Sequence, residues 1–360
     1  MPPKHKSDKH SAADDPAVAK IKETSMFKPI VHKITAEHES ALKELKESFD
    51  APVPDWVDDG IFMRFLRQKK FDVDGAFDAL SNHIAWVESF VEWPRDRVEA
   101  HPEFKAAIAY LLPEADYFGR PIMYVRPRNI NPALRADAEG VRQVFCSLVR
   151  DVNAFCKKHG TDSAVILYDL HGFAARNRDN ATMKMQIDVM EKQYPGGLGN
   201  IVFCRYPWLL YPVYSVAKLW LDKETTERVV FCDDLSTLLQ LTHKKNIPEG
   251  LGGELKEREP SIEVWPKTKG WFSGWFGGGT DSSTASTAAP AAQEDDDGGD
   301  PFAGLSEAER KKKLEEMERD ELKKAKELEE QEAKETEKHA HLHAKTKRTR
   351  RQKGHHHHRK

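Results

Sequence analysis

The chain has few cysteines, and their positions fit none of the common cysteine-based sites. Only four occur in 360 residues, and no two of them form a CxxC pair. Disulfide scaffolds and structural zinc sites both require closely spaced or numerous cysteines. We therefore expect reduced, buried thiols at Cys146, Cys156, Cys204 and Cys232.

Long hydrophobic runs are also missing. No segment reaches the roughly 20 apolar residues that a membrane-spanning helix needs, and the polar residues 1–15 lack the apolar centre of a signal peptide. The formal net charge is only -3, so the overall charge identifies no partner. These features predict a soluble, cytoplasmic protein.

Catalytic and metal-binding motifs are absent as well. The chain contains no GxSxG, HExxH or GxxxxGK[ST] motif, and no GxGxxG that opens a helix after a strand. Asp169 and His171 could form a base with its orienting carboxylate, but an Asp at a strand end commonly caps a turn, and we favour that interpretation. Asp233 and Asp234 are better explained by helix capping than by a metal. We expect no catalytic residues, no metal and no cofactor other than a bound ligand.

Apolar residues are concentrated in the middle of the chain, between about residues 61 and 255. The flanking regions are polar, rich in Gly and Ser, or charged, which is typical of disorder, linkers and solvated helices. A lone solvated helix is favoured over a coiled coil for the charged region, because its apolar positions are too sparse for a heptad seam. The predicted organisation is disorder at 1–33, a helical bundle at 34–92, an α/β domain at 100–256, a flexible linker at 257–303, a charged helix at 304–344 and a basic tail at 345–360.

Strand-like and helix-like segments alternate in the central region. Short apolar runs at 121–125, 165–170, 201–204 and 229–232 predict strands, and helical spacing of apolar residues predicts helices at 141–155 and 182–191. Strands that alternate with helices form largely parallel sheets with crossover connections. The fold class is therefore α/β.

One stretch, from about residue 208 to residue 221, is unusual because it is apolar on almost every side. Val213, Val216, Ala217 and Trp220 share one helical face, and other large apolar residues widen it until only Ser215 and Lys218 break the ring. At about 14 residues the helix is too short to span a bilayer. It must be fully buried, or it must have protein on one side and another apolar material on the other.

Several stretches resemble landmarks of the CRAL-TRIO family. Residues 65–73, FLRQKKFDV, are similar to the FLRARKFDV signature of its N-terminal bundle, and 168–172, YDLHG, to MDLKG. Residues 194–199, YPGGLG, resemble YPERLG, and 247–253, IPEGLGG, resemble the closing LPxEYGG. The resemblance covers about residues 35 to 255. It implies a small helical bundle, then a mixed, largely parallel sheet that floors a lipid cavity closed by a mobile gate helix.

The resemblance also implies positions for the cavity and the gate. Strand residues on one side and the inner face of the gate helix are expected to line the lipid pocket. These are Ala164, Ile166, Tyr168, Ile201, Phe203, Leu210, Tyr214, Ala217 and Leu221. The outer face of the gate is expected to consist of Val213, Val216 and Trp220.

The headgroup positions match the family only in part. Lys70 and Arg228 keep two basic positions of the phosphatidylinositol-transfer branch, whereas Gly196 replaces its Glu. Hydroxyl-bearing positions that hold phosphocholine in that branch correspond here to Ala164, Ile166 and Met123. Lys70, Arg228 and Lys218 are the candidate headgroup or membrane contacts, although a solvated helix face is slightly favoured for the basic residues around Lys70. We expect a less polar ligand, or a headgroup held differently.

Two functions remain open from the sequence. The first is a lipid-binding protein that transfers or senses a single hydrophobic lipid and associates peripherally with a membrane surface. The second is a membrane-associated scaffold whose charged helix recruits a protein partner and whose basic tail contacts an anionic surface. No nucleic acid is expected as a partner, although the tail alone could equally be a nuclear or RNA-binding address.

Overall fold

The computed structural model describes residues 16–207, 210–221 and 223–265, together with scattered positions between 306 and 330. Helices α1 to α6 precede the first strand, and the later helices lie between the strands or after the last one. The helices are α1 (Pro16–Thr24), α2 (Ala36–Glu47), α3 (Asp59–Gln68), α4 (Val73–Ser89), α5 (Arg95–Ala100), α6 (Pro102–Lys105), α7 (Ala138–His159), α8 (Asn180–Gln193), α9 (Leu210–Ala217), α10 (Lys223–Glu227) and α11 (Leu235–Leu239). The strands are β1 (Ala109–Leu111), β2 (Ile122–Val125), β3 (Ala164–Asp169), β4 (Leu198–Cys204) and β5 (Val229–Cys232).

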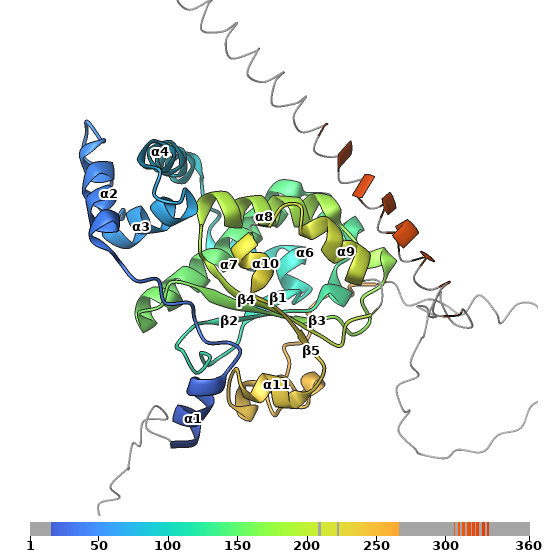
Figure 1. Ribbon diagram of the computed structural model, residues 1–360. Helices are drawn as coiled ribbons and strands as arrows, with labels where there is room; N and C mark the ends of the chain where they lie inside the picture. Colours follow the sequence, from blue (N-terminus) through green and yellow to red (C-terminus); the bar gives the residue numbers. More distant parts are fainter. Residues whose placement is uncertain are drawn as a thin grey trace, which may run out of the picture.

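The five strands form one sheet in the order β1-β2-β3-β4-β5. β1 pairs antiparallel with β2, and the remaining pairs are parallel, which confirms the predicted mixed, largely parallel sheet. Parallel crossovers are almost always right-handed, so strands added in one direction place every connecting helix on the same face. Accordingly α7, α8, α9 and α10 all lie on one side of the sheet (Figure 1).

The two faces of the sheet have different roles because successive strand residues point to opposite sides. One set packs into the largest buried cluster with Leu238, Leu241 and Ile247 of the chain after β5. That set comprises Ile122, Tyr124, Val165, Leu167, Val202, Cys204 and Cys232. The alternate residues face the helices α7 to α9. All four cysteines are buried and free, as predicted.

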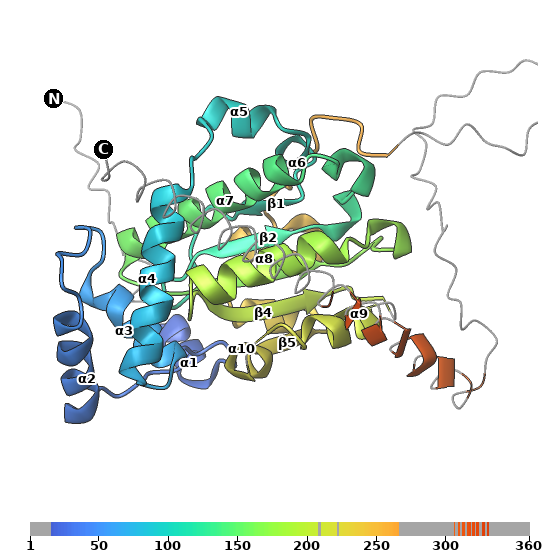
Figure 2. The same ribbon diagram turned by 90° about the horizontal axis from the view of Figure 1, so that it is seen from above.

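The N-terminal bundle of α2, α3 and α4 stands beside the sheet domain (Figure 2). Its core includes Leu45, Phe65, Leu66 and Leu80, each at most 1% exposed. Asp58 caps α3 by accepting from the Ile61 amide, so its carboxylate satisfies one of the amide donors that a helix start leaves unpaired.

His83 of α4 joins this bundle to the sheet domain. The side chain is 6% exposed, and its Nδ1 donates to the Gln193 amide oxygen over 3.0 Å. The rings of Phe65, Trp56 and Tyr194 lie 5.2, 5.5 and 6.0 Å from the imidazole. Burial among these rings lowers the pKa of His83, and the Gln193 hydrogen bond offsets the shift only in part.

We predict that this histidine makes the protein less stable in mild acid. The unfolded chain takes up a proton on His83 near pH 6.5, whereas the folded chain resists it, so stability is present above that pH and is lost as pH falls below it. Between pH 7.5 and 5.5 the loss should be about 1 kcal/mol. Urea unfolding of the wild type and of His83→Phe measures it, and the variant should lack that part of the pH dependence. His171→Phe, at an exposed position, is the control, and its stability should change with pH as that of the wild type does.

The expected disorder at residues 1–33 is wrong for the part from residue 16 onward. Residues 16–24 form α1, and Phe27 is completely buried in the cluster beneath the sheet. The Phe27 carbonyl accepts from Arg120, and the Ser25 hydroxyl donates to the Gln240 carbonyl. A polar segment can therefore be ordered by one aromatic anchor, which average composition does not reveal.

The predicted start of the linker at residue 257 is also wrong. Glu257 pairs with Arg126 and Arg128, and the Trp265 indole nitrogen donates to the Arg128 carbonyl. Ile262 and Val264 pack against a cluster that contains Met123 and Ile166. The packed domain therefore extends to Trp265. The rest of the expected linker and the basic tail lie outside the described residues, while described positions of the charged helix between 309 and 330 are helical.

Candidate functional site: an apolar cavity under α9

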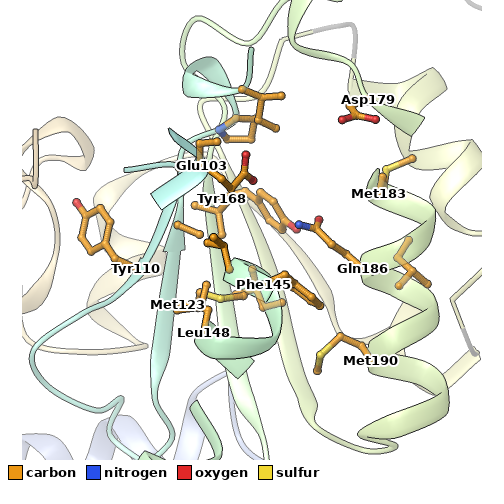
Figure 3. Close-up of a pocket in the computed structure, with 18 of the residues that line it drawn as sticks. Glu103, Tyr110, Met123, Phe145, Leu148, Tyr168, Asp179, Met183, Gln186 and Met190 are labelled. Carbon is orange, nitrogen blue, oxygen red and sulfur yellow. The ribbon is translucent and has the colours of Figure 1, made fainter. Parts of the chain in front are cut away.

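A cavity of about 450 Å³ lies between the sheet and the helices α7, α8 and α9. Its floor consists of the strand residues that face the helices. Its walls are apolar side chains of the covering helices, including Phe145, Leu148, Met183 and Met190 (Figure 3). The volume falls within the usual range of small-molecule sites. The right-handed crossovers create this space, because they place three helices over one face of the sheet.

Most of the predicted pocket residues lie in the wall of this cavity. Strand alternation places four of them on its floor, and α9 with the turn after it supplies four more. They are Ile166, Tyr168, Ile201, Phe203, Leu210, Tyr214, Ala217 and Leu221. Ala164 is absent from the wall, and the prediction for it is wrong. It packs instead against Val152 and Cys156 of α7, where β3 begins.

Helix α9 covers one end of the cavity with its apolar side chains. Leu210 is buried, and the Tyr214 ring stands edge-on to Phe203 of β4 at 5.7 Å between centroids. After Ala217 the chain continues as a turn to Leu221, so the helix is shorter than the predicted 14 residues. The strand and helix residues together form one apolar cluster around Leu170, Ile201 and Phe203.

The prediction for the outer face of α9 is wrong. Val213 lines the cavity, Val216 is only 1% exposed, and Trp220 is half-buried with its ring 5.8 Å from the Lys184 ammonium of α8. Only Leu219, at 48%, is an exposed large apolar residue among the described positions of this segment. Val213 and Val216 therefore do not form an exposed outer face, and Trp220, in the turn after α9, reaches Lys184 of α8.

The end of the cavity away from Met190 is polar (Figure 3). Arg135 donates to both carboxylate oxygens of Glu103 and, at 3.2 Å, to Asp179, the residue that caps α8. Burial alone would raise the pKa of Asp179, but the hydrogen bonds from Thr182 and the charge of Arg135 outweigh it and hold the pKa low. This arginine is balanced by two carboxylates. Arg178, which also borders the cavity, has its pKa lowered by burial.

Asp169, at the end of β3, is fully buried, and its carboxylate is held by hydrogen bonds within the domain. Its carboxylate accepts from Arg128 at 2.6 Å, from Arg205 at 2.6 and 2.8 Å, and from the Tyr124 hydroxyl at 3.0 Å. Burial would raise its pKa, yet the bonds from the two arginines lower it below the usual range. His171 is exposed, and only its backbone amide reaches Asp169. The structure thus favours the turn-capping interpretation of Asp169.

The three candidate headgroup contacts do not converge on the cavity. Lys70 is exposed in the turn after α3, and Lys218 is exposed with its ammonium 4.8 Å above the Tyr214 ring. Arg228 precedes β5, donates to the Leu198 carbonyl at 2.9 Å and pairs with Glu224. None of the three is part of the cavity wall. Their role in headgroup or membrane contact stays a prediction.

Sequence reasoning missed the polar residues of the cavity. Gln186 of α8 lies between Met183 and Met190 on the face that lines the space (Figure 3). Its position three residues after Met183 was a usable signal, because a polar residue in the apolar stripe of a helix requires an explanation. Glu103 and Arg135 are far apart in the chain, and no local pattern would have paired them.

Comparisons with known proteins agree with this geometry. Residues 106–253 match the family model described as the CRAL/TRIO domain. The chain is 28% identical over 207 residues to the phosphatidylinositol transfer protein CSR1 of Eremothecium gossypii, and 22% identical over 220 residues to clavesin-1 of Xenopus laevis. The crystal structure of Sfh5 is similar in fold, with a TM-score of 0.51, 16% sequence identity, and coverage of 66% of this chain and 96% of that chain.

These relatives are matched only in part. The similarity to CSR1 covers 54% of this chain and 47% of that protein, and the similarity to clavesin-1 covers 59% and 65%. For this chain, the activity of either relative is therefore a proposal. Among the described residues, no helix is long and apolar enough to cross a membrane.

Proposed function

Because residues 106–253 are a CRAL/TRIO domain, we propose that the protein binds one hydrophobic lipid in the cavity under α9 and carries it between membranes or reports its presence. The observation that carries this proposal is the cavity itself: about 450 Å³, walled by aliphatic, aromatic and methionine side chains. Apolar surface of this kind gains free energy when it is covered by a hydrocarbon rather than by water. The proposed role is binding rather than catalysis.

The charges around the cavity favour a ligand of low polarity. Arg135 faces Glu103 and Asp179, so this cluster carries no excess positive charge for a phosphate. Lys70, Arg228 and Lys218 lie outside the wall. Three further arginines border it: Arg95 pairs with Glu99 and Asp151, Arg258 lies 4.3 Å from the centre of the Phe104 ring, and burial lowers the pKa of Arg178. A phosphate buried without a compensating cation costs several kcal/mol. A neutral lipid, or one whose charged headgroup stays outside, fits better.

A peripheral encounter with a membrane is part of the proposal. The side chain of His32 lies 3.6 Å from Glu224, which brings the extended segment before α2 to α10, near the end of the gate. Apolar side chains on this segment and around the gate are exposed: Ile30, Val31, Ile34, Leu219 and Phe231. Lys28, Lys33 and Lys218 add positive charge beside them, which suits an anionic lipid surface.

Native mass spectrometry of the purified full chain tests the proposal. We expect one lipid molecule per protein, which is exchanged when the protein is incubated with vesicles that contain a different lipid. A protein that carries no lipid after purification and takes none up from mixed vesicles would contradict the proposal.

A truncation after Trp265 distinguishes the scaffold alternative from lipid binding by the domain alone. Described positions of the charged helix such as Lys312, Glu316 and Lys323 are exposed, so this helix is available to a partner. Lipid uptake should survive the truncation if the domain acts alone. Loss of membrane recruitment with unchanged uptake would assign targeting to the C-terminal region. The cut belongs after Trp265 because residues 257–265 pack on the domain.

A further inference from the structure

Two polar side chains face the interior of the cavity between its charged end and its apolar end. Tyr168 extends from β3, with its ring 5.3 Å from that of Phe203, and Gln186 extends from α8. Figure 3 shows the two heads pointing toward one another across the space, with Glu103 and Asp179 on one side of them and Met190 on the other. Within the described part of the chain, neither the Tyr168 hydroxyl nor the Gln186 amide forms a hydrogen bond.

Both residues are half-buried and border the cavity, so a ligand that displaces water from their polar heads has to offer those heads a partner. A hydroxyl or amide that loses water without gaining a partner opposes binding. Burial raises the pKa of Tyr168 to about 12, so the phenol is neutral and can both donate and accept. The glutamine amide likewise offers two donors and an acceptor. The two groups can therefore satisfy a third polar group placed between them.

We propose that Tyr168 and Gln186 form a hydrogen-bonding site for a neutral hydroxyl or carbonyl group of the bound lipid. A hydroxyl accepts from one side chain and donates to the other, and a carbonyl oxygen accepts from both. An ionised group suits the site poorly, because the apolar side chains of Phe145 and Met183 lie beside it. The inference rests on the proposed function, since it concerns the ligand of the same cavity.

A series of 16-carbon probes tests the site, because its members share a chain and differ in the head. Radiolabelled hexadecane, 1-hexadecanol, 2-hexadecanone and hexadecyl phosphate are presented to the full chain in phosphatidylcholine vesicles. We expect the wild type to prefer the alcohol or the ketone to the phosphate, and the comparison of these two shows whether a hydroxyl or a carbonyl is recognised. Tyr168→Phe and Gln186→Leu should each lower the affinity for the preferred probe about fivefold, and the double variant should lower it about 25-fold.

The controls separate hydrogen bonding from damage to the cavity. Hexadecane binding should stay within about twofold in every variant, because the ring of residue 168 and the bulk of residue 186 are kept. Tyr110→Phe is the matched control: its hydroxyl accepts from the Arg258 amide at 3.1 Å, and its ring points away from the space between Tyr168 and Gln186 (Figure 3). It should leave the preference for the polar probe unchanged.

Three outcomes would overturn the inference. Equal losses of hexadecane and of the polar probe would mean that the variants only deform the cavity. If the wild type binds hexadecane as tightly as it binds the alcohol and the ketone, or if it prefers the phosphate, the neutral polar site is refuted but the lipid cavity is not. A wild type that binds none of the four probes would refute the proposed function and the site together.

Discussion

Asp169→Asn is expected to lower the free energy of unfolding by about 3–5 kcal/mol, the largest effect on stability that we predict for a single substitution. The carboxylate is fully buried and neutralises Arg128 and Arg205 while it accepts the Tyr124 hydroxyl. An amide of the same shape cannot balance two guanidinium groups. The variant would leave positive charge in the interior, at the end of the strand that also carries Tyr168.

Urea unfolding at pH 7 measures the loss, and its pH dependence identifies the cause. The folded protein holds the pKa of Asp169 low, so the contribution is present above the unfolded pKa of about 3.9 and disappears as pH falls below it. Wild type and variant should therefore converge in acid. Asp162→Asn is the control, because this exposed carboxylate meets Arg67 only at 3.9 Å and should cost at most about 1 kcal/mol. Equal losses for the two substitutions would contradict the assigned role.

Ala217→Trp is expected to reduce lipid binding at least tenfold while the protein stays folded. Ala217 is a small residue of α9 in the cavity wall, and an indole at this position would occupy space that the ligand needs. Because the added side chain fills a void and buries apolar surface, thermal stability should be unchanged or raised. The bound lipid is measured by native mass spectrometry and thermal unfolding is recorded on the same sample.

Leu219→Trp is the matched control for this experiment. It places the same side chain two residues later on the same segment, where Leu219 is 48% exposed and lies outside the cavity wall. Its lipid content should equal that of the wild type. If the folded Ala217→Trp protein retains a full complement of lipid, the ligand does not occupy the cavity under α9.

The chain alone was informative where a feature depends on local periodicity. Alternation along β3 and β4 predicted that Ile166, Tyr168, Ile201 and Phe203 share one side, and all four lie in the cavity floor. The same reasoning was weaker for α9. A helix that is apolar all round has no polar stripe to show which face points where, so Val213 and Val216 were assigned to the wrong side.

Contacts between distant segments could not be read from the sequence. Phe27 and the chain from Glu257 to Trp265 lie in polar or charged stretches, yet they pack on the domain because Arg120, Arg126 and Arg128 bind their carbonyl, carboxylate and indole groups. The pairing of Arg135 with Glu103 is of the same kind. Each depends on the path of the backbone, which no local pattern encodes.

What the sequence determined by itself was the α/β class, the order of the elements and the presence of a short helix with too much apolar surface for an ordinary position. Those features follow from hydrophobic periodicity and from the alternation of strand and helix patterns, which are read locally along the chain. The tertiary structure alone decided which polar groups face the cavity. Tyr168 and Gln186 meet there because β3 and α8 are packed on opposite sides of one space, and this arrangement turns an apolar pocket into one with a preference for a neutral polar group.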